Sequence, residues 1–163
     1  MTALAEIRLV VFDFDGVFSD NRVWTNDRGE ESVACYRGDS LGLRRLDEVG
    51  VDYLVITQET NDAVPARARK IRIECIGGIE DKLPVLREEV EKRGVSLAET
   101  AYVGNDVNDA ECLAAVGLPV VPVDAWAEVM PLAKLVLTRA GGYGCVREFC
   151  DALWNAKRAV VSA

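Results

Sequence analysis

Ile7–Gly16 reads IRLVVFDFDG, an apolar run that ends in two carboxylates, Asp13 and Asp15, one residue apart. The run Ile7–Phe12 is short, apolar and rich in β-branched residues, which predicts a strand buried within a sheet. Strands of this composition are typical of parallel sheets whose two faces are both covered by helices. The stretch therefore predicts an α/β fold with Asp13 and Asp15 just beyond the carboxyl end of a strand.

Apolar runs and helix-like segments alternate along the rest of the chain. Further strands are predicted at Asp52–Thr57, Thr100–Val103, Pro119–Val123 and Leu135–Leu137. Helices are predicted at Leu41–Val49, Asp62–Lys70, Leu83–Arg93, Asn108–Val116 and Val146–Arg158, and three of them are followed by a glycine. This alternation predicts a doubly wound parallel sheet with helices on both faces. The length of 163 residues favours one domain, residues 1–163.

One segment interrupts the alternation directly after the first strand. Arg22–Thr25 and Glu30–Tyr36 have the composition of extended chain, and Asn26–Gly29 (NDRG) has the composition of a turn. The segment predicts a β-hairpin that projects from the sheet and is too short to be a second domain.

Composition and charge exclude several kinds of partner. The formal net charge is −8, so phosphates of nucleic acids and anionic membranes would be repelled, and neither is an expected partner. No signal peptide and no apolar stretch approaching a membrane span is present. The odd number of cysteines without a C-x-x-C pattern predicts reduced thiols in a cytoplasmic protein: Cys35, Cys75, Cys112, Cys145 and Cys150. The chain has no histidine, so acid–base chemistry has to use carboxylates, Lys, Tyr or Cys.

Acidic residues follow two of the predicted strands. Asp13 and Asp15 follow the first, and Gly104–Asp109 (GNDVND) follows Thr100–Val103. Taken alone, each cluster could be a solvated loop or a helix N-cap. Because the carboxyl ends of parallel strands meet at one edge of a sheet, the clusters should converge into an oxygen-rich pocket. Few ligands and open water positions in such a pocket suit Mg²⁺ better than Ca²⁺.

Two further residues have the chemistry of a phosphate site. Thr57 follows the strand Asp52–Thr57, where a hydroxyl and backbone N–H groups can hold a phosphate oxygen, although such a threonine is often an ordinary capping residue. Lys82 opens a predicted helix, where its charge opposes the helix dipole. A solvated lysine is the simplest explanation, but pairing with Asp13 and a phosphate would explain the position better.

In this order and combination the motifs resemble those of the haloacid-dehalogenase (HAD) superfamily over nearly the whole chain. They correspond to Asp13 with Asp15, Thr57, Lys82, and Asp106 with Asp109. The resemblance implies that Asp13 attacks phosphorus to form an aspartyl phosphate and that Asp15 serves as acid and then base. It also implies that Asp13, the backbone carbonyl of Asp15 and Asp106 bind Mg²⁺, that Asp109 orients metal waters, and that Thr57 and Lys82 hold the phosphoryl oxygens.

The spaces between the motifs leave no room for the cap domain that most HAD members carry. The chain resembles the capless subclass typified by 3-deoxy-manno-octulosonate 8-phosphate phosphatases, which includes nonulosonate 9-phosphate phosphatases and a domain of some CMP-sialate synthetases. Asp39–Gly42 (DSLG) and Gly141–Glu148 (GGYGCVRE) also match it. The resemblance implies a homotetramer in which hairpins meet and a neighbour covers each active site.

The loop after Thr57 bears on the substrate. Octulosonate phosphatases typically have Gly-Arg there, whereas this chain has Gln58–Asn61 (QETN). Nonulosonate phosphatases typically carry a glutamate, with Arg and Lys on the next helix, and Glu59, Arg67 and Lys70 match that pattern. The resemblance therefore predicts a nonulosonate 9-phosphate (a sialic-acid-type sugar phosphate) as substrate. An octulosonate 8-phosphate, a phospho-receiver module and a non-catalytic oligomerisation domain remain as alternatives.

Overall fold

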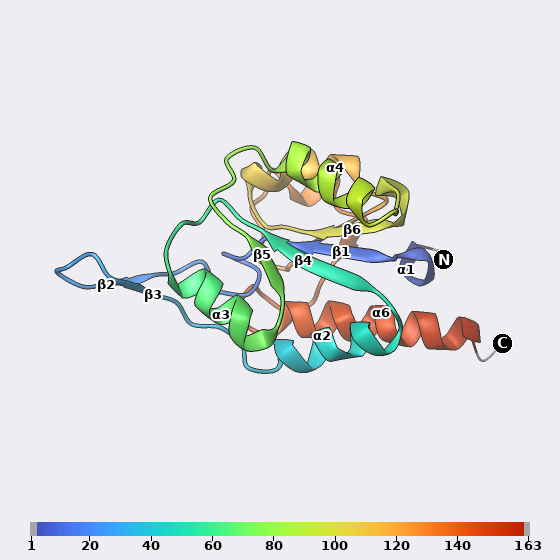
Figure 1. The fold of residues 1–163 in the computed structure, drawn as a ribbon, viewed down its shortest axis with the longest axis horizontal. Coiled ribbons are helices and arrows are strands. Elements are labelled where there is room, and N and C mark those ends of the chain that lie inside the picture. The colour runs from blue at the N-terminus through green and yellow to red at the C-terminus, as the bar shows by residue number, and fades with distance from the viewer. Residues whose placement is uncertain (1–2, 162–163) are drawn as a thin grey trace.

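The computed structural model describes residues 3–161, which form one parallel sheet between two layers of helices (Figure 1). All neighbouring strands are parallel, and their order is β5-β4-β1-β6-β7-β8. The strands are β1 (Leu9–Phe12), β4 (Asp52–Ile56), β5 (Glu74–Ile76), β6 (Thr100–Val103), β7 (Leu118–Val121) and β8 (Leu135–Val136). The doubly wound α/β fold predicted from the sequence is therefore confirmed.

Alternate residues of β1 enter two separate hydrophobic cores, one on each face of the sheet. Val10 and Phe12 belong to one core, and Leu9 and Val11 belong to the other. All four are fully buried, which explains why the strand has an unbroken apolar sequence. Burial on both faces holds the end of β1, and hence Asp13, at the centre of the molecule.

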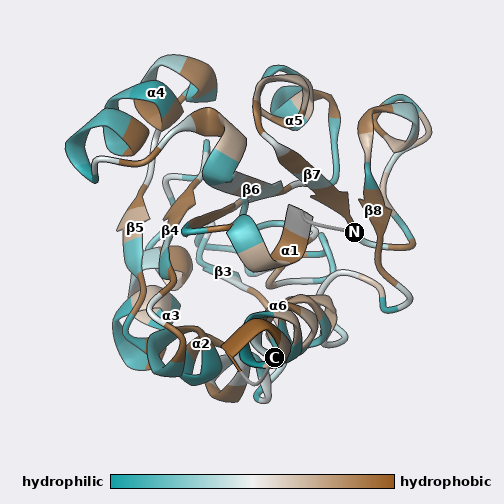
Figure 2. Cartoon of the chain, turned by 90° about the vertical axis from the view of Figure 1, so that its right-hand side faces the viewer, coloured by the Kyte–Doolittle hydropathy of each residue, from teal (hydrophilic) through white to brown (hydrophobic). Residues whose placement is uncertain are grey.

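The helices divide between the two faces, as Figure 2 shows. One layer contains α1 (Ala3–Glu6), α2 (Asp39–Glu48), α3 (Ala63–Ile71) and α6 (Cys145–Val161). The other contains α4 (Lys82–Lys92) and α5 (Ala110–Ala115). The five predicted helices are all present, with ends that differ by a few residues. The predicted helix Asn108–Val116 begins instead with a 3₁₀ turn, Val107–Asp109, before α5.

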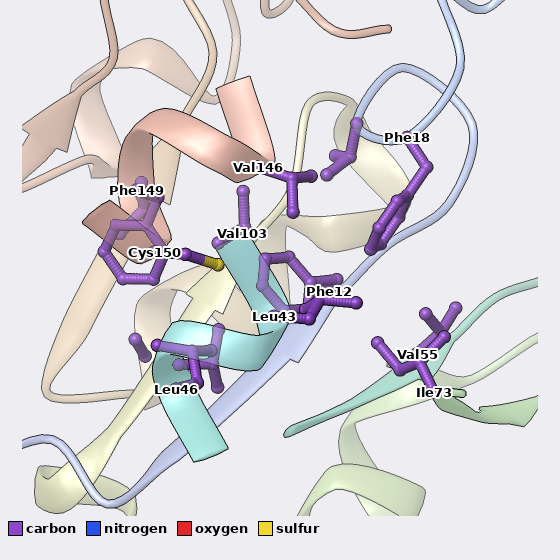
Figure 3. Packing of buried hydrophobic residues seen from close by; sticks show 14 of the residues in the cluster. Phe12, Phe18, Leu43, Leu46, Val55, Ile73, Val103, Val146, Phe149 and Cys150 are labelled. Atoms are coloured by element: carbon purple, nitrogen blue, oxygen red, sulfur yellow. The ribbon is translucent and has the colours of Figure 1, made fainter. Parts of the chain in front are cut away.

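The pair α2 and α6 packs closely because a glycine lies at the contact. A Cβ atom at Gly42 would lie 3.1 Å from both the Cα of Arg147 and the Cβ of Cys150. Leu43 and Leu46 of α2 and Phe149 and Cys150 of α6 gather beside β1 in this core (Figure 3). This packing holds α2 and α6 together as one layer against the sheet.

Two elements differ from the sequence prediction. Glu74–Ile76, which is absent from the predicted strands, is an edge strand of the main sheet. The hairpin is present, but its ladder joins only β2 (Trp24–Thr25) and β3 (Glu31–Ser32). Residues 21–32 are all exposed, so little of the body packs against the ribbon to extend its pairing, although Asn61 Nδ2 donates a hydrogen bond to Glu31 Oε2. The hairpin projects away from the body of the protein (Figure 1).

Candidate active site

The candidate site lies where the order of strands reverses. From β1 the chain continues through β4 and β5 on one side and through β6, β7 and β8 on the other. Loops leaving β1, β4 and β6 diverge at this point, and open α/β sheets bind ligands in the resulting crevice. Asp13 follows β1, Thr57 follows β4, and Gly104–Asp106 follows β6. The register of the sheet therefore brings the predicted motifs to one edge.

Lys82 is buried between two carboxylates. Its Nζ donates hydrogen bonds of 2.8 Å to Asp13 Oδ1 and of 2.8 Å to Asp109 Oδ1. The side chains of Lys82 and Asp109 are 1% and 0% exposed, respectively, so both pairs are shielded from water. The lysine that opposes the dipole of α4 is thus held by two anions, in the arrangement that the sequence predicted for Asp13.

Charge and burial shift the pKa values within this cluster. Burial and the nearby charge of Asp109 raise the pKa of Asp13 to about 7, although Lys82 opposes the change. Burial alone would lower the pKa of Lys82, but the charges of Asp13 and Asp109 outweigh it and raise that pKa. Two carboxylates around one ammonium leave a surplus of negative charge.

Asp15 lies at the edge of the same group. Its Oδ1 accepts a hydrogen bond of 2.8 Å from the Ser19 hydroxyl. Partial burial raises the pKa of Asp15 despite that bond. A carboxyl whose pKa is raised keeps a proton to a higher pH, as a general acid requires.

The loop after β6 uses its acids to build its own shape. Asp106 caps the 3₁₀ turn by accepting a hydrogen bond of 2.7 Å from Val107 N, and Asp109 Oδ2 accepts one of 3.3 Å from Asp106 N. Asp109 Oδ2 also accepts a hydrogen bond of 2.9 Å from Asn105 N. Its Oδ1 accepts hydrogen bonds from Lys82 Nζ and from the Tyr102 hydroxyl. Asp106 therefore caps the turn, as one interpretation of the sequence predicted, and it also lines the cavity over Asp13.

A cavity of about 320 Å³ opens over these residues. Its acidic lining residues are Asp13, Asp15, Glu31, Glu59 and Asp106, and Thr57 and several amide side chains complete the wall. Arg22 is the one basic residue among the residues that line it. An anionic ligand could enter such a cavity only with a cation that neutralises the carboxylates.

The donor set of the cavity fits a hard divalent cation. Asp13 and Asp106 both line it, and the buried Oδ1 of Asn105, which also lines it, has no hydrogen-bond partner among the described residues. Within residues 3–161 no three acidic or cysteine side chains form a metal-binding group, and the expected set contains only two carboxylates and a backbone carbonyl. Few protein ligands and room for water are what Mg²⁺ prefers.

Thr57 and Glu59 are joined by local hydrogen bonds. Thr57 Oγ1 accepts a bond of 3.1 Å from Glu59 N, and Glu59 Oε1 accepts from the backbone N–H groups of Thr60, at 2.9 Å, and Asn61, at 3.2 Å. Both side chains line the cavity. The glutamate therefore shapes the loop and also presents charge to the cavity.

Arg67 and Lys70 lie elsewhere. They share one face of α3, as their spacing predicted, but this face lines a second cavity between α2 and α3 and not the cavity over Asp13. Arg67 Nη2 donates a hydrogen bond of 3.1 Å to Tyr36 O. Within one chain, the structure does not bring these two residues together with Glu59.

Three residues of the site had no predicted role. Ser19 holds Asp15, Tyr102 holds Asp109, and Asn105 lines the cavity. A signal existed for Tyr102, because it is the one aromatic residue in the strand Thr100–Val103. Asn105 lies within the acidic motif, but nothing in the sequence distinguishes it from an ordinary turn residue.

Comparisons with known proteins place this arrangement in a family. No family model matches the chain. The 3-deoxy-D-manno-octulosonate 8-phosphate phosphatase of Salmonella typhi is 34% identical over 158 residues, which are 96% of this chain and 84% of the relative. A Streptomyces avermitilis protein assigned to the HAD family of hydrolases is 40% identical, with a TM-score of 0.87 over 95% of this chain and 88% of its own.

A third relative carries ligands. The octulosonate phosphatase of Moraxella catarrhalis, crystallised with magnesium, phosphate and a KDO molecule, has a TM-score of 0.91 and 30% identity over 99% of this chain and 95% of its own. Fold, motif positions and relatives together define a hydrolase of the HAD class. Within that class, the chain belongs to the capless phosphatase family that contains the 3-deoxy-D-manno-octulosonate 8-phosphate phosphatases.

Proposed function

We propose that the chain is a Mg²⁺-dependent phosphatase that hydrolyses the phosphomonoester of a 3-deoxy-sugar acid through a phosphorylated Asp13. The observation that carries this proposal is the Asp13 carboxylate, which lines the cavity at the end of β1 and is held by Lys82 at 2.8 Å. A carboxylate fixed in this way can be aimed at phosphorus, and phosphoryl transfer depends mainly on such positioning and on charge neutralisation.

The proposed reaction has two steps. An oxygen of Asp13 attacks phosphorus, the bond from phosphorus to the sugar oxygen breaks, and Asp15 gives its proton to the leaving alkoxide. Asp15 then removes a proton from water, which attacks the same phosphorus and releases phosphate and the free Asp13 carboxylate. Thr57 and Lys82 hold the phosphoryl oxygens, and Asp109 acts through Lys82.

Asp13, Asp106 and the backbone carbonyl of Asp15 would bind the magnesium ion. The ion supplies positive charge that offsets the repulsion between the carboxylates and the phosphate. Support comes from the acidic lining of the cavity and from the magnesium in the Moraxella catarrhalis relative. Asp109, whose oxygens are taken by Lys82, Tyr102 and the loop backbone, is better suited to support the site from behind than to contact metal waters.

Octulosonate 8-phosphate is the first candidate substrate. It is supported by the curated relative, which matches nearly the full length of the chain. The nonulosonate hypothesis rested on Glu59, Arg67 and Lys70 acting together, and only Glu59 lines the cavity of its own chain. Nonulosonate 9-phosphate remains the second candidate because the charged Glu59 is favourably placed to bind sugar hydroxyls.

We also propose that the chain acts as one capless domain, residues 1–163, in a cytoplasmic homotetramer. The exposed Trp24 and Val23 on the hairpin support an assembly in which hairpins meet. All five cysteines are free, which suits a reducing compartment. Within residues 3–161, none of the helices has the length and apolar composition needed to span a bilayer.

A phosphate-release screen tests the proposed function. Octulosonate 8-phosphate, nonulosonate 9-phosphate and simple sugar phosphates would be compared with Mg²⁺ and after chelation. We expect turnover of 3-deoxy-sugar-acid phosphates that disappears with the chelator and returns with Mg²⁺. Absence of hydrolysis for every ester in the presence of Mg²⁺ would argue for a non-catalytic module.

Glu59→Gln separates the two candidate substrates. Glutamine can still accept the loop hydrogen bonds through Oε1, so the change removes charge and leaves the loop geometry in place. If a nonulosonate is the substrate, kcat/KM for it should fall about tenfold or more while the value for octulosonate 8-phosphate changes little. An equal loss on both esters would leave the residue without a role in selection.

A further inference from the structure

Tyr102 places a hydroxyl group in the hydrophobic core behind the candidate site. It lies in β6, and its ring belongs to the core on the face covered by α4 and α5. The side chain is fully buried, and Leu86 and Cys112 belong to the same core. Burying a hydroxyl costs free energy unless it is hydrogen-bonded, and phenylalanine would fill the same space without that cost. The hydroxyl is therefore the part of this residue that packing does not explain.

The partner of this hydroxyl is Asp109, which is completely buried as well. Tyr102 Oη donates a hydrogen bond of 2.7 Å to Asp109 Oδ1, and Lys82 Nζ donates one of 2.8 Å to the same oxygen. Asp109 Oδ2 accepts hydrogen bonds from the backbone N–H groups of Asn105, at 2.9 Å, and Asp106, at 3.3 Å. An ionised carboxylate has about four acceptor positions, so these four donors fill them. Asp109 therefore cannot turn without breaking a buried hydrogen bond.

The backbone of Gly104 also confines the Asp109 side chain. A Cβ atom at Gly104 would lie 2.6 Å from both Cβ and Cγ of Asp109, which is closer than such atoms pack. Glycine at this position thus lets the carboxylate lie directly against the loop that follows β6. A carboxylate confined in this way can hold the ammonium group of Lys82 in one position.

Three hydrogen bonds connect the core to the proposed nucleophile. Tyr102 and Lys82 both donate to Asp109 Oδ1, and Lys82 Nζ also donates to Asp13 Oδ1 at 2.8 Å. Because Lys82 opens α4 and Asp109 directly precedes α5, Tyr102 joins β6 to the starts of both helices of this layer. Burial and the charge of Asp109 raise the pKa of Tyr102, so the hydroxyl keeps its proton and remains a donor.

We propose that Tyr102 is a positioning residue for phosphoryl transfer: its hydroxyl fixes Asp109, which orients the Lys82 ammonium group and thereby the Asp13 carboxylate. The hydroxyl also shares the negative charge of Asp109 with the lysine, which leaves the ammonium group available to Asp13. Holding Asp13 Oδ1 fixes the rotation of the carboxylate and so the direction of its other oxygen. The inference rests on the proposed function, because a small misplacement of an attacking oxygen slows the reaction strongly.

Tyr102→Phe tests the proposal, because it removes the hydroxyl and keeps the ring in the core. The matched control is Tyr53→Phe, which removes another tyrosine hydroxyl that donates to a carboxylate, Asp47 at 2.9 Å, outside the cavity over Asp13. With Mg²⁺ and the best ester of the screen, kcat should fall about tenfold or more in Tyr102→Phe, while KM changes less than about threefold. Both constants should stay within about twofold in the control.

Thermal unfolding of the same proteins separates positioning from stability. A lower melting temperature in Tyr102→Phe with an unchanged kcat would make the hydroxyl a purely structural group and overturn the proposal. A fall in kcat while the protein stays folded at the assay temperature supports it.

A second variant shows whether the effect passes through Asp109. In Asp109→Asn the hydroxyl has no carboxylate to fix, so adding Tyr102→Phe to this variant should lower the residual kcat less than about twofold further. The same factor in the wild-type and the Asp109→Asn backgrounds would mean that Tyr102 acts by another route, and would overturn the proposal.

Crystal structures of the wild type and of Tyr102→Phe distinguish this proposal from the phosphatase assignment. In the variant we expect the Asp109 carboxylate to rotate and Lys82 Nζ to lie beyond hydrogen-bond distance of Asp13 Oδ1, more than about 3.5 Å away. A wild type that hydrolyses no ester would overturn the proposed function, and a displaced Lys82 would still support the positioning of Asp13. An unchanged contact between Lys82 and Asp13 would overturn the positioning role, whatever the activity.

Discussion

Lys82 begins α4, where a positive charge opposes the helix dipole, and yet its ammonium group is fully buried. Two carboxylates at 2.8 Å compensate for the unfavourable helix dipole and for the burial of the ammonium group. Asp13 gains from the same contact, because the lysine holds one of its oxygens and opposes the rise in its pKa. At the scale of single residues, the buried charges of the site therefore stabilise one another.

Asp13→Asn should abolish phosphate release, with a loss of at least about 10³-fold, because an amide is not a nucleophile toward phosphorus. The fold should survive, since Asn Oδ1 can still accept from Lys82, and Asp109 continues to pair with the lysine. Steady-state kinetics and thermal unfolding would measure the two effects. Asp62→Asn, on an exposed aspartate outside the site, is the matched control. Full activity in Asp13→Asn would remove the nucleophile assignment.

Asp39 offers a prediction about pH. Burial raises the pKa of this carboxyl from 3.8 to about 7. Its Oδ1 accepts a hydrogen bond of 3.2 Å from Arg147 N, and its Oδ2 has no hydrogen-bond partner among the described residues. The folded protein therefore keeps the proton where the unfolded chain loses it. The stabilising effect of that proton is complete below about pH 4 and is lost as the pH rises through about 7.

Asp39→Asn should consequently reduce the loss of stability between pH 4 and pH 8. Asparagine can accept from Arg147 N without carrying a charge, so the variant should be more stable than the wild type at pH 8, by up to about 4 kcal/mol. Urea unfolding of both proteins across this range gives the difference. Parallel pH profiles for the two proteins would contradict the assignment of a buried, titrating carboxyl.

Among the elements, α6 contributes most to the core on its face of the sheet. Its buried residues are Cys145, Val146, Phe149, Cys150 and Leu153, and they recur at helical spacing. The helix packs on α2, where Gly42 permits a close approach. Ser40, Leu43, Arg44 and Asp47 of α2 line the second, basic cavity, so the packing of α2 also sets the geometry of that cavity.

Leu153→Ala should therefore be costly. Leu153 is completely buried, and its truncation should lower the free energy of unfolding by about 2–5 kcal/mol through lost burial and a residual cavity. Val160→Ala on the same helix is the control, because Val160 is 65% exposed and should cost less than about 0.5 kcal/mol. Urea denaturation measures both. Similar losses in the two variants would mean that α6 does not pack on the core at Leu153.

At the scale of the whole molecule, charge and apolar surface are unevenly distributed. The cavity over Asp13 is acidic, the cavity between α2 and α3 is basic, and the hairpin carries an exposed tryptophan into solvent. A monomer gains nothing from displaying Trp24 at 75% exposure on a projecting ribbon whose residues 21–32 are all exposed. The proposed contact between hairpins of neighbouring copies would bury it.

Trp24→Ser should weaken that assembly, because it removes a large apolar side chain from the expected contact. Sedimentation should show a tetramer for the wild type and smaller species for the variant at low micromolar concentration. Trp126→Ser is the control, since Trp126 is 57% exposed but lies far from the hairpin in sequence, after β7. A variant that keeps the mass of the wild type would exclude the hairpin tryptophan as an assembly residue.

The sequence by itself determined five of the six strands of the main sheet, the layers of helices and the residues that meet above β1. Apolar runs became strands, and the parallel register aligned their ends. Asp13 and Thr57 follow such ends directly, and Asp106 is the third residue after the end of β6. A residue adjacent to a strand end has little freedom in where it lies, so local pattern sufficed. Lys82 was also predicted, because a cation at a helix start needs a partner.

Only the tertiary structure decided where the side chains of helices point. Spacing placed Arg67 and Lys70 on one face of α3, but the docking of α3 beside α2 turned that face toward a second cavity. Likewise, Asp109 faces Lys82 and Tyr102 and not the open cavity because the turn after Asp106 directs it inward. The direction of a helix face depends on contacts distant in sequence, which one-dimensional spacing does not contain.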